Sequence, residues 1–423
     1  MRIHLAAAFL LLAPAAALAN GYHLPTPSPR DLALAGSGTA AQNSAAAVYG
    51  NPAALAGLQG LNVAGDFGLI AIGAKWTDPT RSLGTTSTDC NGTVPISCNS
   101  VPKAAPWPAL YVSYGDKVGG RNFAVGAGLS IAGGGVFFWP DDWPGRASIT
   151  NVNRFSIAID AVAAYQPIDM LKVAAGFIYY RTVEKLYQRL PVPGGRDIDV
   201  ELSADGGAPS FHLAGELQPV EGFKLGIDYR HQAVQHLEGR AHFGHVPVNL
   251  NNILRDQSAK HDLTFPNVLQ VGASYQVTPD FLVTAGWLLV RWVVYREDVF
   301  NGEQGLKVSV PHRYRNGFGF SLGGEYKLPA PVDGLILRLG LERLRGPQPP
   351  ETMHPAIPDG SHSTITGGVG YKVMPNLEVA FGYKLAVVDT TTSVGTEAFP
   401  GEYSVVAHFM SLGATWQFGG GAK

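Results

Sequence analysis

Two-residue alternation of side-chain character, repeated in segment after segment, limits the fold of this chain more than any other feature. In the segment 410–418 one face reads Met410, Leu412, Ala414, Trp416 and Phe418, and the other reads Ser411, Gly413, Thr415 and Gln417. Segments at 123–131, 318–328, 335–342 and 377–385 alternate in the same way. Apolar residues that recur at every second position over about ten residues are typical of transmembrane β-strands. The pattern predicts an all-β protein.

The second face of these strands separates a membrane barrel from a soluble β-sandwich, whose strands also alternate. It mixes Gly, Ser, Glu, Lys and Arg, which suits a wet lumen better than a packed core. A bundle of membrane helices is excluded, because the best apolar run, 281–290, ends at Arg291, whereas a helix needs about 18 apolar residues. Charged residues are only 15% of the chain, and the net charge of −2 offers no basic surface for nucleic acid.

The first nineteen residues have the form of a secretory signal peptide. Arg2 supplies the positive charge, 5–12 form the apolar region, and Ala17-Leu18-Ala19 forms a cleavage site. Export leads to an oxidising compartment, so we expect Cys90 and Cys98, which share one polar stretch, to form a disulfide. A metal site at these cysteines would need further ligands, and no His lies near them.

Counting the alternating segments predicts a transmembrane antiparallel β-barrel of about fourteen strands. We place them at 61–76, 107–116, 122–135, 154–168, 171–190, 199–219, 223–243, 263–278, 281–300, 317–328, 335–347, 361–374, 377–391 and 403–418. Short turns alternate with long loops, as periplasmic turns and extracellular loops require. Aromatic residues near the strand ends are expected to form interface girdles: Trp76, Trp107, Tyr111, Tyr114, Tyr165, Tyr275, Tyr326, Tyr371 and Trp416.

Residues 20–60 precede the first strand and show only weak periodicity. A barrel of this size has a lumen too wide for its own side chains to fill, so we expect this segment to lie inside as a plug. Asn51-Pro52-Ala53 can anchor the plug, because Asn side chains bond to nearby backbone and Pro fixes φ. An ordinary surface turn is the alternative interpretation of this triplet.

This N-terminal segment resembles the hatch of the FadL family, outer-membrane transporters of long-chain fatty acids and aromatic hydrocarbons. The resemblance lies in Gly36-Ser37-Gly38-Thr39-Ala40-Ala41 and in 44–55, which contain the Asn-Pro-Ala triplet. The ending Trp416-Gln417-Phe418 and Ala356-Ile357-Pro358-Asp359 before a Gly-rich strand are also similar. The implied parts are a signal peptide at 1–19, a hatch at 20–60, a barrel at 61–418 and a tail at 419–423, which family members usually lack.

The resemblance implies passive uptake of hydrophobic molecules across a Gram-negative outer membrane, with long-chain fatty acids ahead of aromatic hydrocarbons. We expect a monomer whose partners are the hydrophobic ligand and membrane lipids, without a cofactor or a bound metal. A general porin is an alternative, although porins lack such a plug, and a barrel enzyme or adhesin is a remote one. No catalytic motif occurs, and His242 and His245 are weak metal ligands.

Charged residues on the predicted lumen face are candidates for ion pairs that hold the hatch or for ligand contacts. They are Asp160, Glu216, Asp228, Arg230, Arg291, Arg338, Glu342, Glu378 and Lys384. A carboxylate ligand would need an unpaired cation beside an apolar slot. Arg291, whose face includes Trp287, is the first candidate, and Arg338 is the second.

The loop at 244–262 is unusually apolar for a connection that faces solvent. It contains Val246, Val248, Leu250, Ile253 and Leu254. Exposed apolar patches mark binding sites, so we expect this loop to capture ligand. Packing of these residues on a neighbouring loop is the equally weighted alternative.

The third predicted strand is rich in glycine: Gly126, Gly128, Gly133, Gly134 and Gly135. Glycine inside a strand marks bulges, bends or close backbone approach. The resembled family has a kinked third strand that opens sideways beside the hatch, so these glycines are expected to form a lateral exit. The alternative is that they only make room for the plug.

Overall fold

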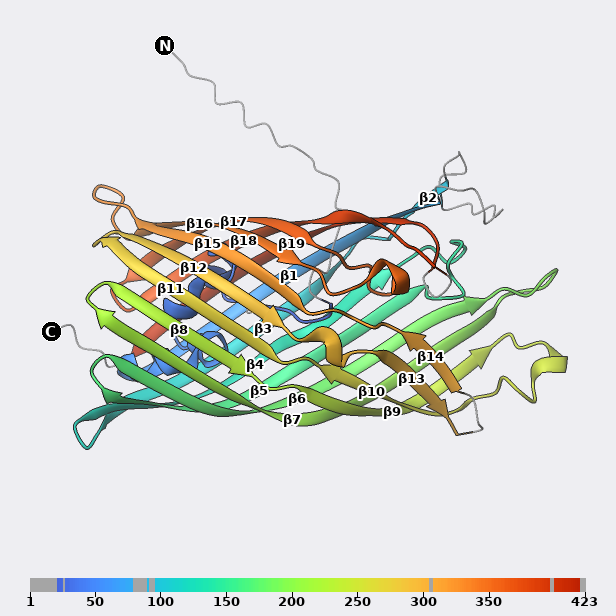
Figure 1. Ribbon diagram of the computed structural model, residues 1–423, viewed down its shortest axis with the longest axis horizontal. Helices are drawn as coiled ribbons and strands as arrows, with labels where there is room; N and C mark the ends of the chain where they lie inside the picture. Colours follow the sequence, from blue (N-terminus) through green and yellow to red (C-terminus); the bar gives the residue numbers. More distant parts are fainter. Residues whose placement is uncertain are drawn as a thin grey trace, which may run out of the picture.

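The computed structural model describes residues 21–25, 27–78, 90, 96–303, 307–395 and 399–418. The predicted signal peptide at 1–19 and tail at 419–423 lie outside these residues. Over the described ranges, the antiparallel strands run along the barrel wall fourteen times, and we call each such passage a crossing; together they close into one barrel (Figure 1). Closure is made by the first and last strands, which pair from Leu61 with Phe418 to Thr77 with Glu402.

Ten crossings are single strands, and four are pairs of shorter strands in line. The single strands are β1 (Gly60–Asp78), β3 (Lys103–Val118), β4 (Arg121–Phe138), β5 (Asn151–Ile168), β6 (Leu171–Leu190), β7 (Ile198–Val220), β16 (Leu335–Arg345), β17 (His362–Met374), β18 (Leu377–Thr392) and β19 (Glu402–Phe418). The pairs are β8 (Phe223–Arg230) with β9 (Ala233–Gly244), β10 (Gln257–Phe265) with β11 (Val268–Thr278), β12 (Phe281–Val290) with β13 (Glu297–Gly302), and β14 (Lys307–Pro311) with β15 (Gly317–Lys327). A short strand, β2 (Ile96–Asn99), extends the pairing of β1.

The predicted number and order of crossings are confirmed, and three predicted strands differ in being interrupted. The breaks lie at 231–232, at 266–267 and at 291–296. Pro266 supplies no N–H for a ladder, which accounts for the second break. In the third, a 3₁₀ turn at Trp292–Val294 places the buried rings of Trp292 and Tyr295 inside the barrel. Strands β10 and β14 also occupy parts of 244–262 and 301–316, which the sequence predicts as loops.

The two faces of the wall differ as the alternation predicts. Phe320 and Leu339, on the apolar phase, are 63% and 69% exposed, whereas Arg338 next to Leu339 is 2% exposed. The exposed band is therefore apolar and faces lipid, and the polar phase faces the lumen. Six of the predicted girdle residues are exposed at the short-turn end of this band: Tyr114, Tyr165, Tyr275, Tyr326, Tyr371 and Trp416. The girdle assignment is wrong for Trp76, Trp107 and Tyr111, which are fully buried.

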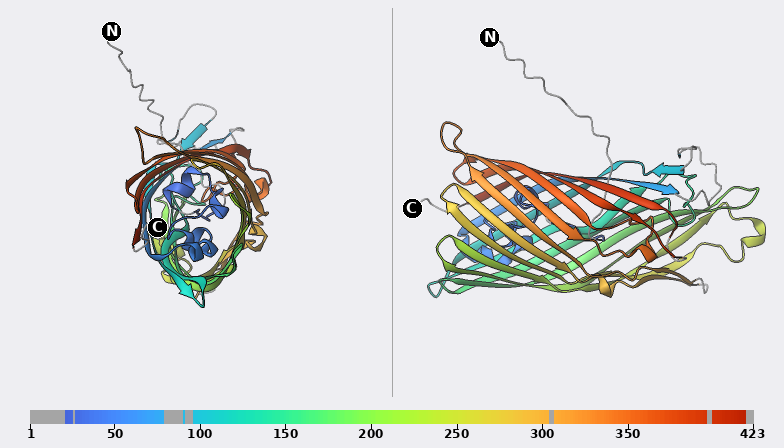
Figure 2. Two further views of the ribbon diagram at one scale, coloured as in Figure 1. Left: turned by 90° about the vertical axis from the view of Figure 1, so that its left-hand side faces the viewer. Right: turned by 45° about the horizontal axis from the view of Figure 1, so that its top comes forward.

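The segment before β1 lies inside the barrel, toward the end with the short turns (Figure 2). It contains four short helical turns: α1 (Pro29–Ala33), η1 (Gly38–Ala40), α2 (Ala47–Gly50) and η2 (Pro52–Gly57). Helix α1 contacts β16 to β19, η1 contacts β8, β11 and β12, and η2 contacts β3 to β7. The segment therefore touches most of the wall's circumference. None of the helices in the described ranges has the length and the apolar composition that a membrane-spanning helix needs.

Candidate functional site

Asn51 fastens the inner segment, residues 21–59, to the barrel wall. Its side chain is fully buried, and Nδ2 donates to the backbone oxygens of Thr39 (2.9 Å) and of Gly215 on β7 (3.2 Å). Its Oδ1 accepts a hydrogen bond from the N–H of Ala53 (3.2 Å) and caps η2, which Pro52 begins. One side chain thus satisfies backbone groups of both the inner segment and the wall, which is the geometry of an anchor.

A buried ion-pair network makes a second attachment, on the opposite side of the inner segment. Nε of Arg30, in α1, lies 2.8 Å from Glu325 on β15. The same carboxylate lies 2.7 Å from Arg338 on β16, whose Nη2 reaches Glu378 on β18 at 2.6 Å. Breaking one partner of such a network leaves an uncompensated buried charge. Arg338 therefore serves in a network that holds the inner segment, and its charge is balanced.

The lumen assignment of Arg291 is wrong. Its side chain is exposed, and it follows the row of β12 that includes Trp287 and Leu289. Trp287 borders a small cavity beside the inner segment, but its cross-strand partner is Phe320, which faces lipid. The sequence interpretation took an apolar lipid-facing row for a slot inside the barrel, so neither Arg291 nor Trp287 presents its side chain to the lumen. Most of the other predicted lumen charges, such as Asp160 and Asp228, are buried, and Glu342 and Glu378 are half-buried.

The wall is interrupted between β3 and β4. Their pairing runs from Val118–Arg121 to Ala109–Ser130 and ends there, although both strands continue. Beyond this point, among the described strands, β3 pairs with β1 and β4 pairs with β5, and the two do not pair with each other. The two edges meet again where the N–H of Val101 donates to the carbonyl of Phe138 (2.6 Å). We call the unpaired stretch, 102–108 against 131–137, the wall gap.

Pro106 and Pro108 explain why the ladder stops on the β3 side. Residues two apart in a strand direct their backbone groups to the same edge. Pairing of β3 with β1 continues past both prolines, so their missing N–H groups lie on the edge that faces β4. The indole N–H of Trp107, between them, instead donates to the carbonyl of Ile131 across the wall gap (3.1 Å).

On the β4 side the wall gap begins at a bulge. The register with β5 shifts between Ile131 and Gly133, and Gly134 has a φ of 137°. A Cβ at Gly134 would lie 2.1 Å from the carbonyl oxygen of Arg154, so only glycine fits. By contrast, a Cβ at Gly126 or Gly128 would meet Val48 of the inner segment. The glycines thus divide: Gly133, Gly134 and Gly135 lie at the wall gap, and Gly126 and Gly128 make room for the inner segment.

The inner segment covers the wall gap from inside. The N–H of Leu24 donates to the carbonyl of Ala132 (2.9 Å), and the N–H of Gly134 donates to the carbonyl of Tyr22 (2.8 Å), with a β-bridge from His23 to Gly133. The hydroxyl of Tyr22 also donates to the carbonyl of Thr264 on β10. Tyr22 therefore spans the lumen from one wall to the other, and its ring packs edge-on against Phe265, Trp292 and Tyr295.

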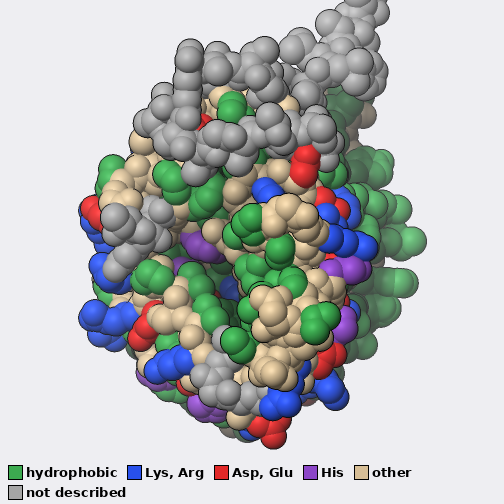
Figure 3. Space-filling view, turned by 90° about the vertical axis from the view of Figure 1, so that its right-hand side faces the viewer, with side chains coloured by type: hydrophobic (Ala, Val, Ile, Leu, Met, Phe, Trp, Pro, Cys, Tyr) green, Lys and Arg blue, Asp and Glu red, His purple; other side chains and the backbone are tan. Residues whose placement is uncertain are grey.

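A cavity of about 370 Å³ lies on the other side of Tyr295, toward the long-loop end. Its lining is mostly apolar and includes Ile149, Val152, Leu202, Phe300 and Ile357. Arg154, Asp298 and Tyr314 add polar groups. At this end of the molecule hydrophobic side chains gather around a hollow between the loops (Figure 3). A largely apolar cavity with a few convergent polar groups is typical of small-molecule sites.

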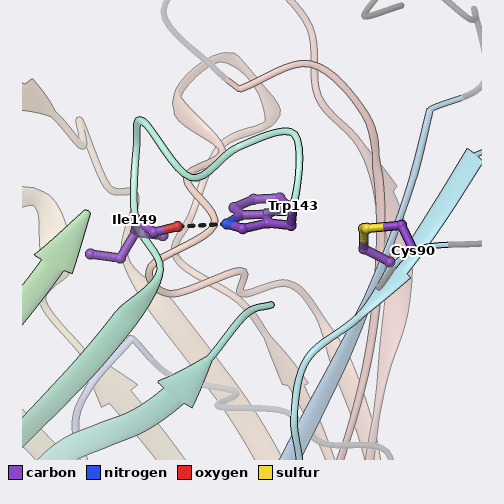
Figure 4. The surroundings of a disulfide bond; sticks show 4 residues. Cys90, Trp143 and Ile149 are labelled. Carbon is purple, nitrogen blue, oxygen red and sulfur yellow. Dashed lines mark hydrogen bonds between the residues drawn. A yellow bond between two sulfur atoms is a disulfide. The ribbon is translucent and has the colours of Figure 1, made fainter. Parts of the chain in front are cut away.

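A tryptophan cluster fixes the loops around this cavity. Trp139 stacks on Trp143 with ring centroids 4.5 Å apart, and Trp76 packs edge-on against Trp143. The indole N–H groups donate to loop carbonyls: Trp143 to Ile149 (2.8 Å), Trp139 to Pro355 (3.0 Å) and Trp76 to Pro400 (2.9 Å). In the structure Cys90 and Cys98 are joined by a disulfide, which lies near Trp143 (Figure 4). The loops are therefore joined to one another.

The apolar loop before β10 divides between solvent and the cavity. Val248 and Ile253 are 88% and 64% exposed, and the turn η3 (Val248–Leu250) projects from the long-loop end. Leu254, by contrast, lines the large cavity. Of the residues predicted to capture ligand, Val248 and Ile253 are therefore exposed to solvent, and Leu254 borders the cavity. The side chains of His242 and His245 have different partners: Nδ1 of His242 hydrogen-bonds to Asp256, and Nδ1 of His245 hydrogen-bonds to Asp199.

Sequence reasoning missed Tyr22 and the proline pair. Tyr22 lies in a segment without periodicity, and no local signal marks it. Pro106 and Pro108 carried a usable signal, because proline within a strand is confined to edges and bulges. Their alternate spacing beside a Gly-rich neighbouring strand indicates an interrupted ladder.

Comparison with known proteins agrees with this architecture. A family model described as outer membrane protein transport protein (OMPP1/FadL/TodX) matches residues 10–418. The crystal structure of a Pseudomonas aeruginosa FadL homologue superposes with a TM-score of 0.81 at 21% identity, covering 94% of this chain and 100% of that one. The Ralstonia pickettii toluene transporter TbuX gives 0.66 at 18% identity, covering 92% and 98%. The Pseudomonas putida toluene transporter TodX gives 0.69 at 16%, covering 94% and 100%. No curated protein sequence matches.

Proposed function

The chain belongs to the OMPP1/FadL/TodX family of outer membrane transport proteins, and from this premise we propose a route for its hydrophobic ligand. The ligand is captured at the extracellular loops, passes from the large cavity by the hatch, and leaves sideways through the wall gap into the outer membrane. The hatch is the inner segment described above. The whole route lies within one chain, which supports action as a monomer.

The observation that carries this proposal is the wall gap beside Tyr22. A closed barrel satisfies every backbone group through its ladder, so an interruption in membrane-facing wall needs a reason. Here the free edge of β4 is bonded instead to Tyr22 and Leu24, which belong to the hatch. Displacement of these residues would open a path from the lumen to lipid. A small cavity lined by Leu24, Ile72, Pro106 and Phe155 already lies there.

Lateral release is also the favourable direction for a greasy ligand. Each buried CH₂ is worth about 0.8 kcal/mol, so a tail of about fifteen methylenes meets a barrier on the order of 12 kcal/mol on leaving into periplasmic water. Release into the bilayer avoids this cost. The hatch, meanwhile, occupies the periplasmic half of the lumen and is bonded to several strands, which supports exclusion of polar solutes.

The ligand class has two candidates, long-chain fatty acids and aromatic hydrocarbons. The sequence favours the first, and the superposed structures carry the names of both a FadL homologue and toluene transporters. Both classes fit an apolar cavity of about 370 Å³. They differ in charge, because a fatty acid carries a carboxylate at neutral pH and an aromatic hydrocarbon carries no ionisable group.

The proposal is tested with purified protein in liposomes. We expect rapid transfer of a hydrophobic probe such as pyrene-labelled decane into the bilayer, together with slow flux of sugars measured by liposome swelling. Removal of residues 20–60 should leave a folded barrel, because the strands pair with one another, but should make sugar flux fast. Fast sugar flux through the intact protein would instead identify a general porin.

A further inference from the structure

The charges inside the barrel bear on the ligand class, which the proposed function leaves open. The basic side chains that face the lumen in the described residues all lie against carboxylates. Arg30 and Arg338 share Glu325, Arg154 pairs with Glu184, Lys172 and Lys224 share Glu216, Arg230 pairs with Asp228, and Lys384 pairs with Glu342. A carboxylate ligand would have to displace one of these partners before it gained a cation.

Further carboxylates lie buried in the lumen without a salt bridge in the part of the chain described here. These are Asp31, Asp66 and Asp160. Neither oxygen of Asp160 has a hydrogen-bond partner among the described residues. A carboxylate buried without a cation is stable mainly in its neutral form, so these three groups offer a carboxylate ligand no positive charge to bind.

The large cavity has the same character. Arg154 lines it with its charge balanced by Glu184, and Asp298, which also lines it, lies 3.1 Å from Nε2 of His312 and accepts a hydrogen bond from the hydroxyl of Tyr295. Oδ1 of Asp298, the hydroxyl of Tyr314 and Nη1 of Arg154 have no hydrogen-bond partner among the described residues. Together they offer both an acceptor and donors, which a neutral hydroxyl can satisfy in both directions.

We propose that this path selects uncharged hydrophobic molecules, such as hydrocarbons and long-chain alcohols, and discriminates against carboxylate anions. The inference rests on the proposed uptake function and specifies its ligand class. A carboxylate carried past these pairs would be buried without a partner or would leave a carboxylate of the protein without one, and both are unfavourable. An uncharged head group meets neither cost.

The test compares decan-1-ol with decanoate, which share a tail and differ in head charge. Binding to the purified protein in a neutral detergent is measured by calorimetry at about pH 8, where decanoate is ionised. We expect decan-1-ol to bind at least about tenfold more tightly than decanoate. Equal or tighter binding of decanoate would overturn the inference. If neither compound binds, the proposed uptake function itself is contradicted.

Single substitutions that free a cation in the lumen are expected to shift this preference toward decanoate. Glu184→Gln leaves Arg154 unbalanced at the large cavity, so decanoate should bind more tightly while decan-1-ol is unchanged. The matched control is Glu238→Gln, whose partner Lys260 lies on the outer surface, and it should alter neither affinity. If Glu184→Gln does not fold, Glu342→Gln frees Lys384 in the same way. This pair borders the small cavity beside the inner segment, and the variant should likewise bind decanoate more tightly. No gain for decanoate in the variant that folds would contradict the proposal.

Discussion

The indole N–H of Trp107 donates to the backbone carbonyl of Ile131 at 3.1 Å, and this bond crosses the wall gap that separates β3 from β4. It takes the place of the ladder bonds that the flanking prolines cannot make. A side chain can withdraw from such a bond without unpairing any strand. Trp107 is therefore suited to act as a clasp, by which we mean a side-chain hydrogen bond that holds the two edges of the wall gap together and can break without unpairing a strand.

We predict that Trp107→Phe loosens this clasp. The variant keeps an aromatic ring against Phe409 but loses the N–H, and a net hydrogen bond is worth about 1 kcal/mol. Release of a hydrophobic probe from protein to liposome membrane should accelerate by about fivefold, as stopped-flow fluorescence would show. Trp416→Phe, on the lipid-facing row of β19, serves as the control. An unchanged release rate would mean that the bond does not restrain the wall gap.

The prolines offer the opposite manipulation. Replacing Pro106 and Pro108 together with Ala restores two N–H groups on the edge of β3 that faces β4. We expect β3 and β4 to pair further and the wall gap to narrow, so uptake should fall severalfold while the barrel stays folded. Amide exchange at 106 and 108 would report the new bonds. Pro209→Ala on β7 is the control, and undiminished uptake in the double variant would place the exit elsewhere.

The wall of this barrel and the position of residues 20–60 inside it were predictable from the sequence, whereas the partners that hold the inner segment were not. Alternation along 410–418 or 335–342 has a direct physical cause, since every second side chain meets lipid. The prediction for β12 was wrong because its apolar row, which faces lipid, was assigned to the lumen. Arg291, which follows that row, was therefore assigned to the lumen as well. The hatch contacts of Asn51 and Arg30 depend on partners such as Gly215 and Glu325, more than 160 residues away, and no local pattern encodes such pairs.

Asn51 gives the third prediction. Asn51→Ala removes donors to Thr39 and Gly215 and the cap on Ala53, and leaves two buried carbonyls less well satisfied. Each loss costs about 1 kcal/mol or more, so the hatch should move more readily while the strands remain paired. Liposome swelling with small sugars should become faster than in the wild type. Asn43→Ala, at an exposed hatch position, should leave swelling unchanged. Equal swelling in both variants would mean that Asn51 does not restrain the hatch.

The apolar loop gives the fourth. Val248→Ser with Ile253→Ser removes exposed apolar surface, whereas Leu254→Ser changes the cavity lining. If the loop captures ligand, the surface pair should slow uptake at low ligand concentration and spare it at saturation. Leu254→Ser should instead weaken equilibrium binding to the purified protein. Unchanged uptake by the surface pair would eliminate the loop as a capture surface.

The last prediction concerns His354, in the extracellular loop that carries Ala356 and Ile357 to the large cavity. Enclosure against the protein lowers the pKa of this imidazole to about 3, and nearby His312 acts in the same direction. In an opened loop the pKa returns toward its ordinary value near 6.5. Between these values the open form binds more protons than the closed form, so the closed loop loses stability as the pH falls below about 6.5.

Acidification from about pH 6.5 to about pH 5 should therefore lower the stability of the closed loop, relative to the open loop, by about 2 kcal/mol, since each pH unit in this interval is worth about 1.4 kcal/mol. Amide exchange of 353–357, corrected for its intrinsic pH dependence, should show the opening. In the structure the N–H of Ala356 donates to Nδ1 of His354 at 3.2 Å. In His354→Asn the amide oxygen can accept this bond, and the side chain does not titrate. The variant should lose the pH response. A response that persists in His354→Asn would assign the effect to another group, because protonation of residue 354 could then no longer cause it.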